Sequence, residues 1–105
     1  AVTKKFLIRG VGPTLAGFGV TGALANPTLN VVDSAGRTVA ANDDWETNVN
    51  LAELRAATTQ FAFPLAPGSR DAALLLSLPA GAYTCVVSGV GNTSGTALVE
   101  VYEVP

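Results

Sequence analysis

The pattern of hydrophobic and polar positions predicts a chain built mainly from β-strands. Short runs rich in β-branched, aromatic and aliphatic residues recur about every ten residues, separated by turns that contain Gly, Pro, Asn or Asp. The predicted strands cover residues 2–8, 28–32, 37–41, 71–78, 82–89 and 96–104. Residues 10–27, rich in Gly and Pro, are predicted to form a long ordered loop with a short strand at 15–20. Because such strand spacing is typical of a sandwich or barrel, we expect an all-β fold, most simply a β-sandwich.

Three details refine this pattern. Residues 33–36 read Asp-Ser-Ala-Gly, a turn composition that predicts a hairpin between the strands on either side. Residues 71–78 show no polar alternation, so this strand should be buried on both faces. In the last strand, Ala97, Val99 and Val101 share one face because successive side chains of a strand alternate.

One segment, residues 50–57, is predicted to be a short helix. Asn50 precedes it and Glu53 follows three residues later, as in a capping box, where each side chain satisfies a free backbone N–H of the first turn. Leu51 and Leu54 would then face inward together.

Composition narrows the classes of partner. The chain has 105 residues, of which 49% are hydrophobic and 13% charged, and its mean hydropathy is +0.40. Either the core is large for the surface, or a partner covers part of the surface. The net charge is −2, with no basic cluster beyond Lys4, Lys5 and Arg9, which argues against nucleic acid as a partner. No apolar run reaches the ~18 residues needed to span a bilayer, so we expect no membrane insertion.

Catalytic chemistry has little support in the sequence. The chain contains no His, which excludes His-based triads and the common zinc sites. Its one cysteine, Cys85, lies within a predicted strand, has no partner for an intrachain disulfide and has no His to activate it. We therefore expect a non-catalytic protein without a required cofactor.

The best candidate for a bound ion is the segment Asn42, Asp43 and Asp44, which follows a predicted strand. Calcium takes six to eight oxygen ligands, and Glu46 and Asp71 are available to complete such a shell. The alternative is a turn in which the Asn and Asp side chains bond the local backbone.

Two further positions have a functional and a structural interpretation. Trp45, the only tryptophan, could stack on a sugar ring if exposed, or plug the end of the core if buried. The triplet Asn92, Thr93, Ser94 matches an N-glycosylation acceptor in a predicted loop.

The ends of the chain suggest assembly. The first predicted strand begins almost at residue 1 and the last runs to Val104, an arrangement suited to a tandem array or to strand exchange. Ala1 as first residue is expected of a processed or excised chain. We predict that the first strand acts as a donor or edge strand in assembly, through Lys4, Lys5, Phe6, Leu7, Ile8 and Arg9.

Several motifs in order carry a resemblance to a known type of module. They lie at residues 7–15, 18–20, 26–36, 42–45, 69–74, 78–84, 87–89 and 97–103. Together they resemble a repeat module of large exported bacterial surface proteins, notably of Verrucomicrobia. The middle of the chain, with Asn-Asp-Asp at 42–44 and Pro-Ala-Gly-Ala-Tyr at 79–83, is distantly similar to the bacterial pre-peptidase C-terminal domain.

The resemblance implies a jelly-roll-like β-sandwich in an extracellular or cell-surface setting, and supplies no activity. It also implies another strand before the one at 4–9, so we expect residues 1–105 to form one module, completed by a strand from a neighbouring subunit or repeat. The leading hypothesis is a structural module whose partner is itself, in a filament or surface array. The alternative is a polymer- or glycan-binding module appended to a secreted enzyme.

Overall fold

The computed structural model describes residues 3–105, and these residues form mainly antiparallel β-structure. Ala1, the predicted processing site, and Val2, the predicted start of the first strand, lie outside the described residues. In chain order the elements are β1 (Thr3–Val11), the 3-10 helix η1 (Pro13–Phe18), β2 (Pro27–Asp33), β3 (Thr38–Asn42), the 3-10 helix η2 (Trp45–Thr47), α1 (Leu51–Phe61), β4 (Ala72–Pro79), β5 (Tyr83–Gly89), the 3-10 helix η3 (Val90–Asn92) and β6 (Leu98–Val104). Each of the six long apolar runs predicted as strands therefore contains one.

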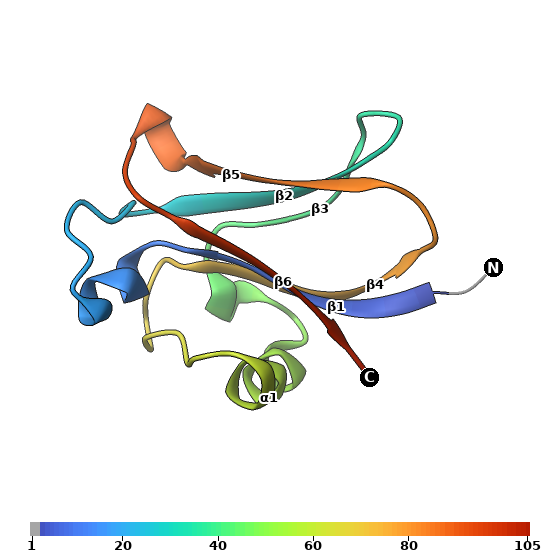
Figure 1. The fold of residues 1–105 in the computed structure, drawn as a ribbon, viewed down its shortest axis with the longest axis horizontal. Helices are drawn as coiled ribbons and strands as arrows, with labels where there is room; N and C mark the ends of the chain where they lie inside the picture. The colour runs from blue at the N-terminus through green and yellow to red at the C-terminus, as the bar shows by residue number, and fades with distance from the viewer. Residues whose placement is uncertain (1–2) are drawn as a thin grey trace.

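The strands form two three-stranded antiparallel sheets, with orders β4-β1-β6 and β3-β2-β5. In the first sheet Leu7 lies opposite Leu75 on one side and Tyr102 on the other. The helix α1 lies on the side of this sheet that faces away from β3-β2-β5 (Figure 1). The β4-β1-β6 sheet thus lies between the second sheet on one side and a helix on the other (Figure 1).

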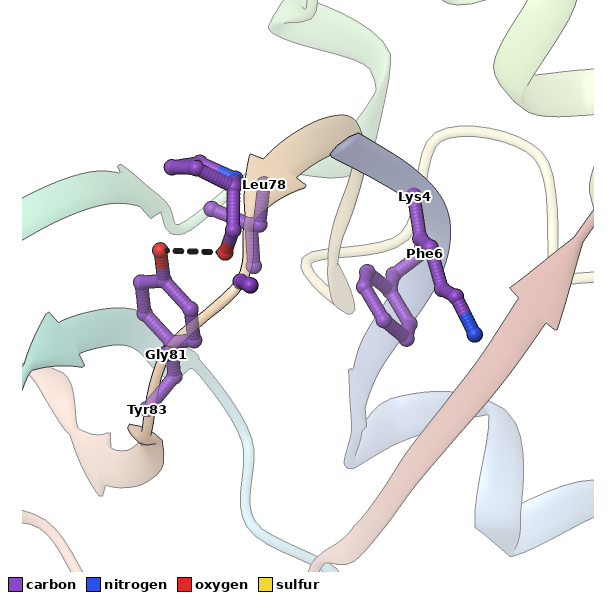
Figure 2. A pocket seen from close by; sticks show the side chains of 7 residues that line it. Lys4, Phe6, Leu78, Gly81 and Tyr83 are labelled. Atoms are coloured by element: carbon purple, nitrogen blue, oxygen red, sulfur yellow. Dashed lines mark hydrogen bonds between the residues drawn. The ribbon is translucent and has the colours of Figure 1, made fainter. Parts of the chain in front are cut away.

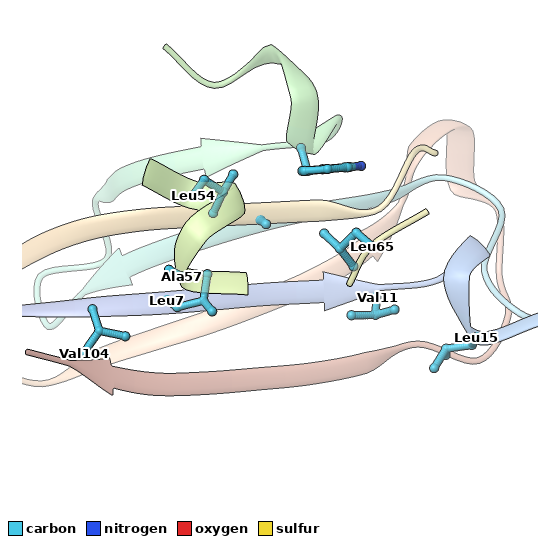
Figure 3. Close-up of a cluster of buried hydrophobic side chains, with 9 residues drawn as sticks. Leu7, Val11, Leu15, Leu54, Ala57, Leu65 and Val104 are labelled. Carbon is cyan, nitrogen blue, oxygen red and sulfur yellow. The ribbon is translucent and has the colours of Figure 1, made fainter. Parts of the chain in front are cut away.

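Two hydrophobic clusters hold these layers together. Between the sheets lie Ile8, Leu29, Val31, Ala72, Leu74 and Leu78. Between the β4-β1-β6 sheet and α1 lie Leu7, Val11, Leu15, Trp45, Leu54, Ala57, Leu65, Ala73 and Val104 (Figure 3). Leu7 and Ile8 are adjacent in β1 and point to opposite faces, so both clusters depend on the central strand.

The strand β1 corrects one expectation. Lys4–Arg9 was expected as a donor or edge strand, but β1 is the central strand of its sheet, paired with both β4 and β6. The edge position is therefore wrong, because both backbone edges of β1 are paired with strands from later in the chain. Donation of this strand to a neighbour would require β1 to leave two strand pairings and both clusters.

The segment after β1 also differs from expectation. The short strand predicted at 15–20 is wrong, since residues Pro13–Phe18 form a 3-10 helix. Pro13 sits at its start, where a fixed φ favours a helical turn, and Gly19 ends it at φ +82°, in the left-handed region. Leu15 from this turn is buried in the cluster beneath α1.

The helix is confirmed but is longer than predicted and begins differently. It spans Leu51–Phe61, and its buried residues are Leu54, Ala57 and Thr58. The predicted capping box is wrong, because Asn50 makes no side-chain cap hydrogen bond. Its side-chain amide instead donates to the Leu75 carbonyl of β4, at 2.9 Å.

The last strand has one buried and one open face. Val104 is buried, and Glu100 and Tyr102 are half-buried on the same face of β6. Val99 and Val101 remain 46% and 55% exposed, although alternation places them on a shared apolar face. This open face lies on the side of the molecule where β5 and β6, outer strands of the two sheets, are not paired with each other.

Candidate functional site

The segment proposed for calcium is used by the fold. The Asn42 side chain accepts a hydrogen bond from the Ala73 N–H at 3.1 Å and donates to the Asp44 carbonyl at 3.1 Å. Asp43 is exposed, and one carboxylate oxygen of Asp44 is buried without a hydrogen-bond partner. Within residues 3–105 no group of three or more His, Cys, Asp or Glu residues has a geometry that could hold a metal ion. The Asn42 contacts match the turn alternative, and calcium binding stays a prediction.

Asp71, suggested as a further calcium ligand, is fully buried and has a structural role. Its carboxylate accepts hydrogen bonds from the Gly12 N–H at 2.8 Å, from the N–H and hydroxyl of Thr14, and from the Ser69 hydroxyl at 2.6 Å. It therefore ties the turn after β1 to the chain entering β4. Charged groups are rarely buried unless so paired, and the sequence offered no local signal for this arrangement.

A second buried polar site lies on the opposite face of β1 from the sheet–sheet cluster. The fully buried Arg9 donates through Nε to Glu100 Oε1 of β6 at 2.8 Å, and its guanidinium lies 4.3 Å from the centre of the Phe63 ring. Burial lowers the pKa of Arg9, opposed by the charge of Glu100, while the hydrogen bond to Glu100 raises the pKa of the Tyr102 hydroxyl. Arg9 and Glu100 thus form a buried ion pair between β1 and β6.

Trp45 is a core residue. It is 4% exposed, its indole N–H donates to the Ser69 hydroxyl at 3.2 Å, and the Arg55 guanidinium lies 5.4 Å from the ring centre. The structural interpretation of Trp45, as a buried residue of the core, is confirmed, and no indole face is available to a sugar. Asn92, of the glycosylation triplet, is exposed and has φ +58°.

The outer edges of the sheets are protected very unequally. At β4, three asparagine side chains occupy backbone groups: Asn42 and Asn48 bond the N–H and carbonyl of Ala73, and Asn50 bonds the carbonyl of Leu75. The strand β3 is only five residues long, and its pairing with β2 shifts register after Val31. Side-chain caps, short strands and bulges are the usual means of preventing edge pairing.

The other two edges, β5 and β6, face the same open side of the molecule, here called the β5–β6 groove. Each pairs with only one strand within the described residues, β5 with β2 and β6 with β1. A hollow of about 220 Å³ in the groove is lined by Phe6, Ile8, Val31, Leu78, Tyr83, Cys85 and Val101. A larger hollow of about 440 Å³, nearer η3, includes Val87 of β5 and Val99 of β6 among its lining residues. Side chains from both edge strands thus line each of the two hollows.

At the other end the groove opens beside the β4–β5 turn. A hollow of about 230 Å³ lies there between Lys4 and Phe6 of β1 and the residues around Gly81 (Figure 2). The Tyr83 hydroxyl donates to the Pro79 carbonyl at 2.8 Å, which holds the turn in place. The walls of this hollow are mainly apolar, and Lys4 is the one charged residue that lines it.

The groove is lined mainly by apolar and hydroxyl-bearing side chains. The thiol that lines the groove is the half-buried, free Cys85, whose pKa is raised by burial, which disfavours the reactive thiolate. Glu100 and Tyr102 lie on the other face of β6, where the Glu100 carboxylate accepts hydrogen bonds from Arg9 and from the Tyr102 hydroxyl. The arrangement is suited to contact with apolar side chains and to backbone hydrogen bonding.

The groove was missed in the sequence, although one signal pointed to it. From Ala72 to Val99 the chain contains no charged residue, and this stretch includes all of β5 and the first two residues of β6. Edge strands are commonly protected by charges, especially Lys, so a charge-free strand is informative once it is known to be an edge. The sequence did not reveal which strands are edges.

Comparisons of the chain with models of known protein families, with curated proteins and with solved structures find no match. Among the described residues, no helix is long and apolar enough to cross a membrane.

Proposed function

We propose that this chain is a non-catalytic structural module that assembles with further copies of itself, or with neighbouring repeats, through strand edges. In this proposal the two sheets form a small jelly-roll-like β-sandwich whose β5–β6 side is completed by a neighbouring strand. The setting is the outside of a bacterial cell, as a filament subunit or part of a surface protein. The resemblance described from the sequence motifs supports this setting.

The observation that carries the proposal is the contrast between the sheet edges. The β4 edge is occupied by Asn42, Asn48 and Asn50, whereas β5 and β6 leave their outer backbone groups to solvent beside apolar side chains. Val86, Val99 and Val101 are 43%, 46% and 55% exposed there. An unprotected edge is a template for another strand, whose main-chain hydrogen bonds add affinity and whose alternate side chains fill pockets.

The glycan-binding alternative receives no comparable support. Its main basis was Trp45, whose ring is enclosed by the core and by Arg55. The hollow between Tyr83 and Val101 in the groove is lined mainly by apolar side chains and includes no charged residue to bind sugar hydroxyls.

Sedimentation velocity over a hundredfold range of protein concentration tests the proposal, with negative-stain microscopy of the most concentrated sample. We expect the weight-average mass to rise with concentration and ordered assemblies to be visible. A mass that stays at the monomer value of 10.6 kDa throughout would reject self-assembly of this chain.

A further inference from the structure

We infer that the β5 edge pairs with the β5 edge of a second copy, antiparallel and about a two-fold axis at Val86. The two β3-β2-β5 sheets then join into one continuous six-stranded sheet. This inference rests on the proposed self-assembly and names the edge, the partner and the register. It identifies Val86, outside the groove's hollows, as the centre of the contact.

The choice of β5 follows from exclusion of the other edges. β4 is capped by asparagines, and β3 is short and irregular in register. The strand β6 carries two carboxylates, each in an ion pair with a cation of β1, Glu100 with Arg9 and Glu103 with Lys4, so it is a more polar edge than β5. The strand β5, seven residues long, contains no charge and no proline.

The sequence of β5 is self-complementary in the proposed register. With Val86 opposite Val86 of the second copy, Cys85 lies opposite Val87, and Thr84 opposite Ser88. Cys85 and Val87 are half-buried toward the groove, whereas Thr84, Val86 and Ser88 are exposed on the outer face. On the inner face, Cys85 of each copy therefore lies opposite an apolar valine. On the outer face, the pair of Val86 residues is flanked by Thr84 opposite Ser88, so each residue lies opposite one of similar polarity.

The size of the contact indicates a weak pair. A seven-residue strand is about 24 Å long, so edge pairing alone falls short of the ~800 Å² per partner of a stable interface. We therefore expect a dimer that forms at high protein concentration and contributes to a larger assembly through additional contacts such as Val99 and Val101 of β6.

Site-directed disulfide formation tests the register in such a weak complex. The test variant carries Val86→Cys in a Cys85→Ala background, and the matched control carries Val39→Cys in the same background. Val39 is 46% exposed on β3, another edge strand of the same sheet, against 43% for Val86. Directly opposed residues of antiparallel strands have Cα separations of about 4.5–5.5 Å, within the range for a disulfide.

Under mild oxidation at high concentration we expect the position-86 variant to form disulfide-linked dimer at least tenfold faster than the position-39 variant. Equal rates would indicate random collision and overturn the β5 pairing. Circular dichroism of both reduced variants checks that each is folded, and exposure of both sites makes that outcome the expected one.

A second pair of variants separates this inference from the proposed function. Val86→Lys places like charges at the two-fold axis, whereas Val39→Lys adds the same charge elsewhere. At the same protein concentration, we expect Val86→Lys to have a lower weight-average mass than the wild type. We expect Val39→Lys to have the same weight-average mass as the wild type. If the wild type assembles and Val86→Lys assembles equally, assembly stands but uses another edge, and the inference fails. If the wild type remains monomeric, both fail.

Discussion

Replacement of Glu100 by Gln is expected to destabilise the fold strongly, because it leaves a buried guanidinium without its charged partner. The Arg9 side chain is completely buried and the Glu100 side chain is only 13% exposed, so water cannot replace the lost contact. What remains around Arg9 is the Phe63 carbonyl and ring, while one guanidinium nitrogen already lacks a hydrogen-bond partner. Removing one partner of a buried pair typically costs about 3–5 kcal/mol, and we expect Glu100→Gln to fall in that range.

The double variant Arg9→Met with Glu100→Gln should recover most of this loss. Without Arg9 no unpaired charge remains, and removal of both charges of a buried ion pair is often close to neutral for stability. Arg55→Met provides the control, because its pair with Glu46 is solvent-exposed, and should cost less than about 1 kcal/mol.

Urea unfolding followed by Trp45 fluorescence measures the free energy of unfolding of these variants, since Trp45 is buried in the folded chain. The reasoning is refuted if Glu100→Gln costs no more than the Arg55 control. It is also refuted if the double variant is as unstable as the single one, because the cost would then come from lost packing and not from an unpaired charge.

Three further predictions concern the core, the buried carboxylate and the thiol. Leu54→Ala should reduce the free energy of unfolding by about 2–5 kcal/mol in urea titration, because Leu54 is a fully buried residue of α1; a loss below about 1 kcal/mol would mean that the helix does not cover the sheet. Asp71→Ala should cost at least about 3 kcal/mol and Asp71→Asn distinctly less, since Asn keeps an acceptor for the Gly12 N–H; equal losses would contradict the hydrogen-bond account. Alkylation of Cys85 should be slower in folded than in urea-unfolded protein at pH 8, because burial raises its pKa from 9.0. For the same reason folding stability should fall above pH 9, where the unfolded thiol ionises first; a Cys85→Ala variant with an unchanged loss would contradict this assignment.

Much of the local structure was predictable because its causes are local. The hairpin at Asp33 is an example: its carboxylate accepts the backbone N–H groups of Ala35 and Arg37, as expected of an Asp-led turn. The strand positions were also predictable, since apolar runs and turn residues are adjacent in the chain. The capping box failed because Asn50, correctly placed before the helix, found a better partner in the Leu75 carbonyl of β4.

The candidate site was less predictable than the strands. The sequence favoured the segment of Asn42, Asp43 and Asp44 because of its oxygen-bearing side chains. In the fold this segment lies beside the capped edge of β4, where Asn42 accepts a hydrogen bond from the Ala73 N–H. The open edge contains residues without distinctive chemistry, such as Val86 and Val101, whose exposure depends on what the fold leaves uncovered.

By itself the sequence determined where strands, the hairpin turn and the helix form, because periodicity and turn chemistry act within a few residues. The tertiary structure alone decided that β1 is central and that β5 and β6 are unprotected edges. Pairing of β1 with β4 and β6 joins residues more than sixty positions apart, such as Leu7 with Leu75 and with Tyr102. Edges are what remains after all such long-range pairings are made, so no local pattern specifies them.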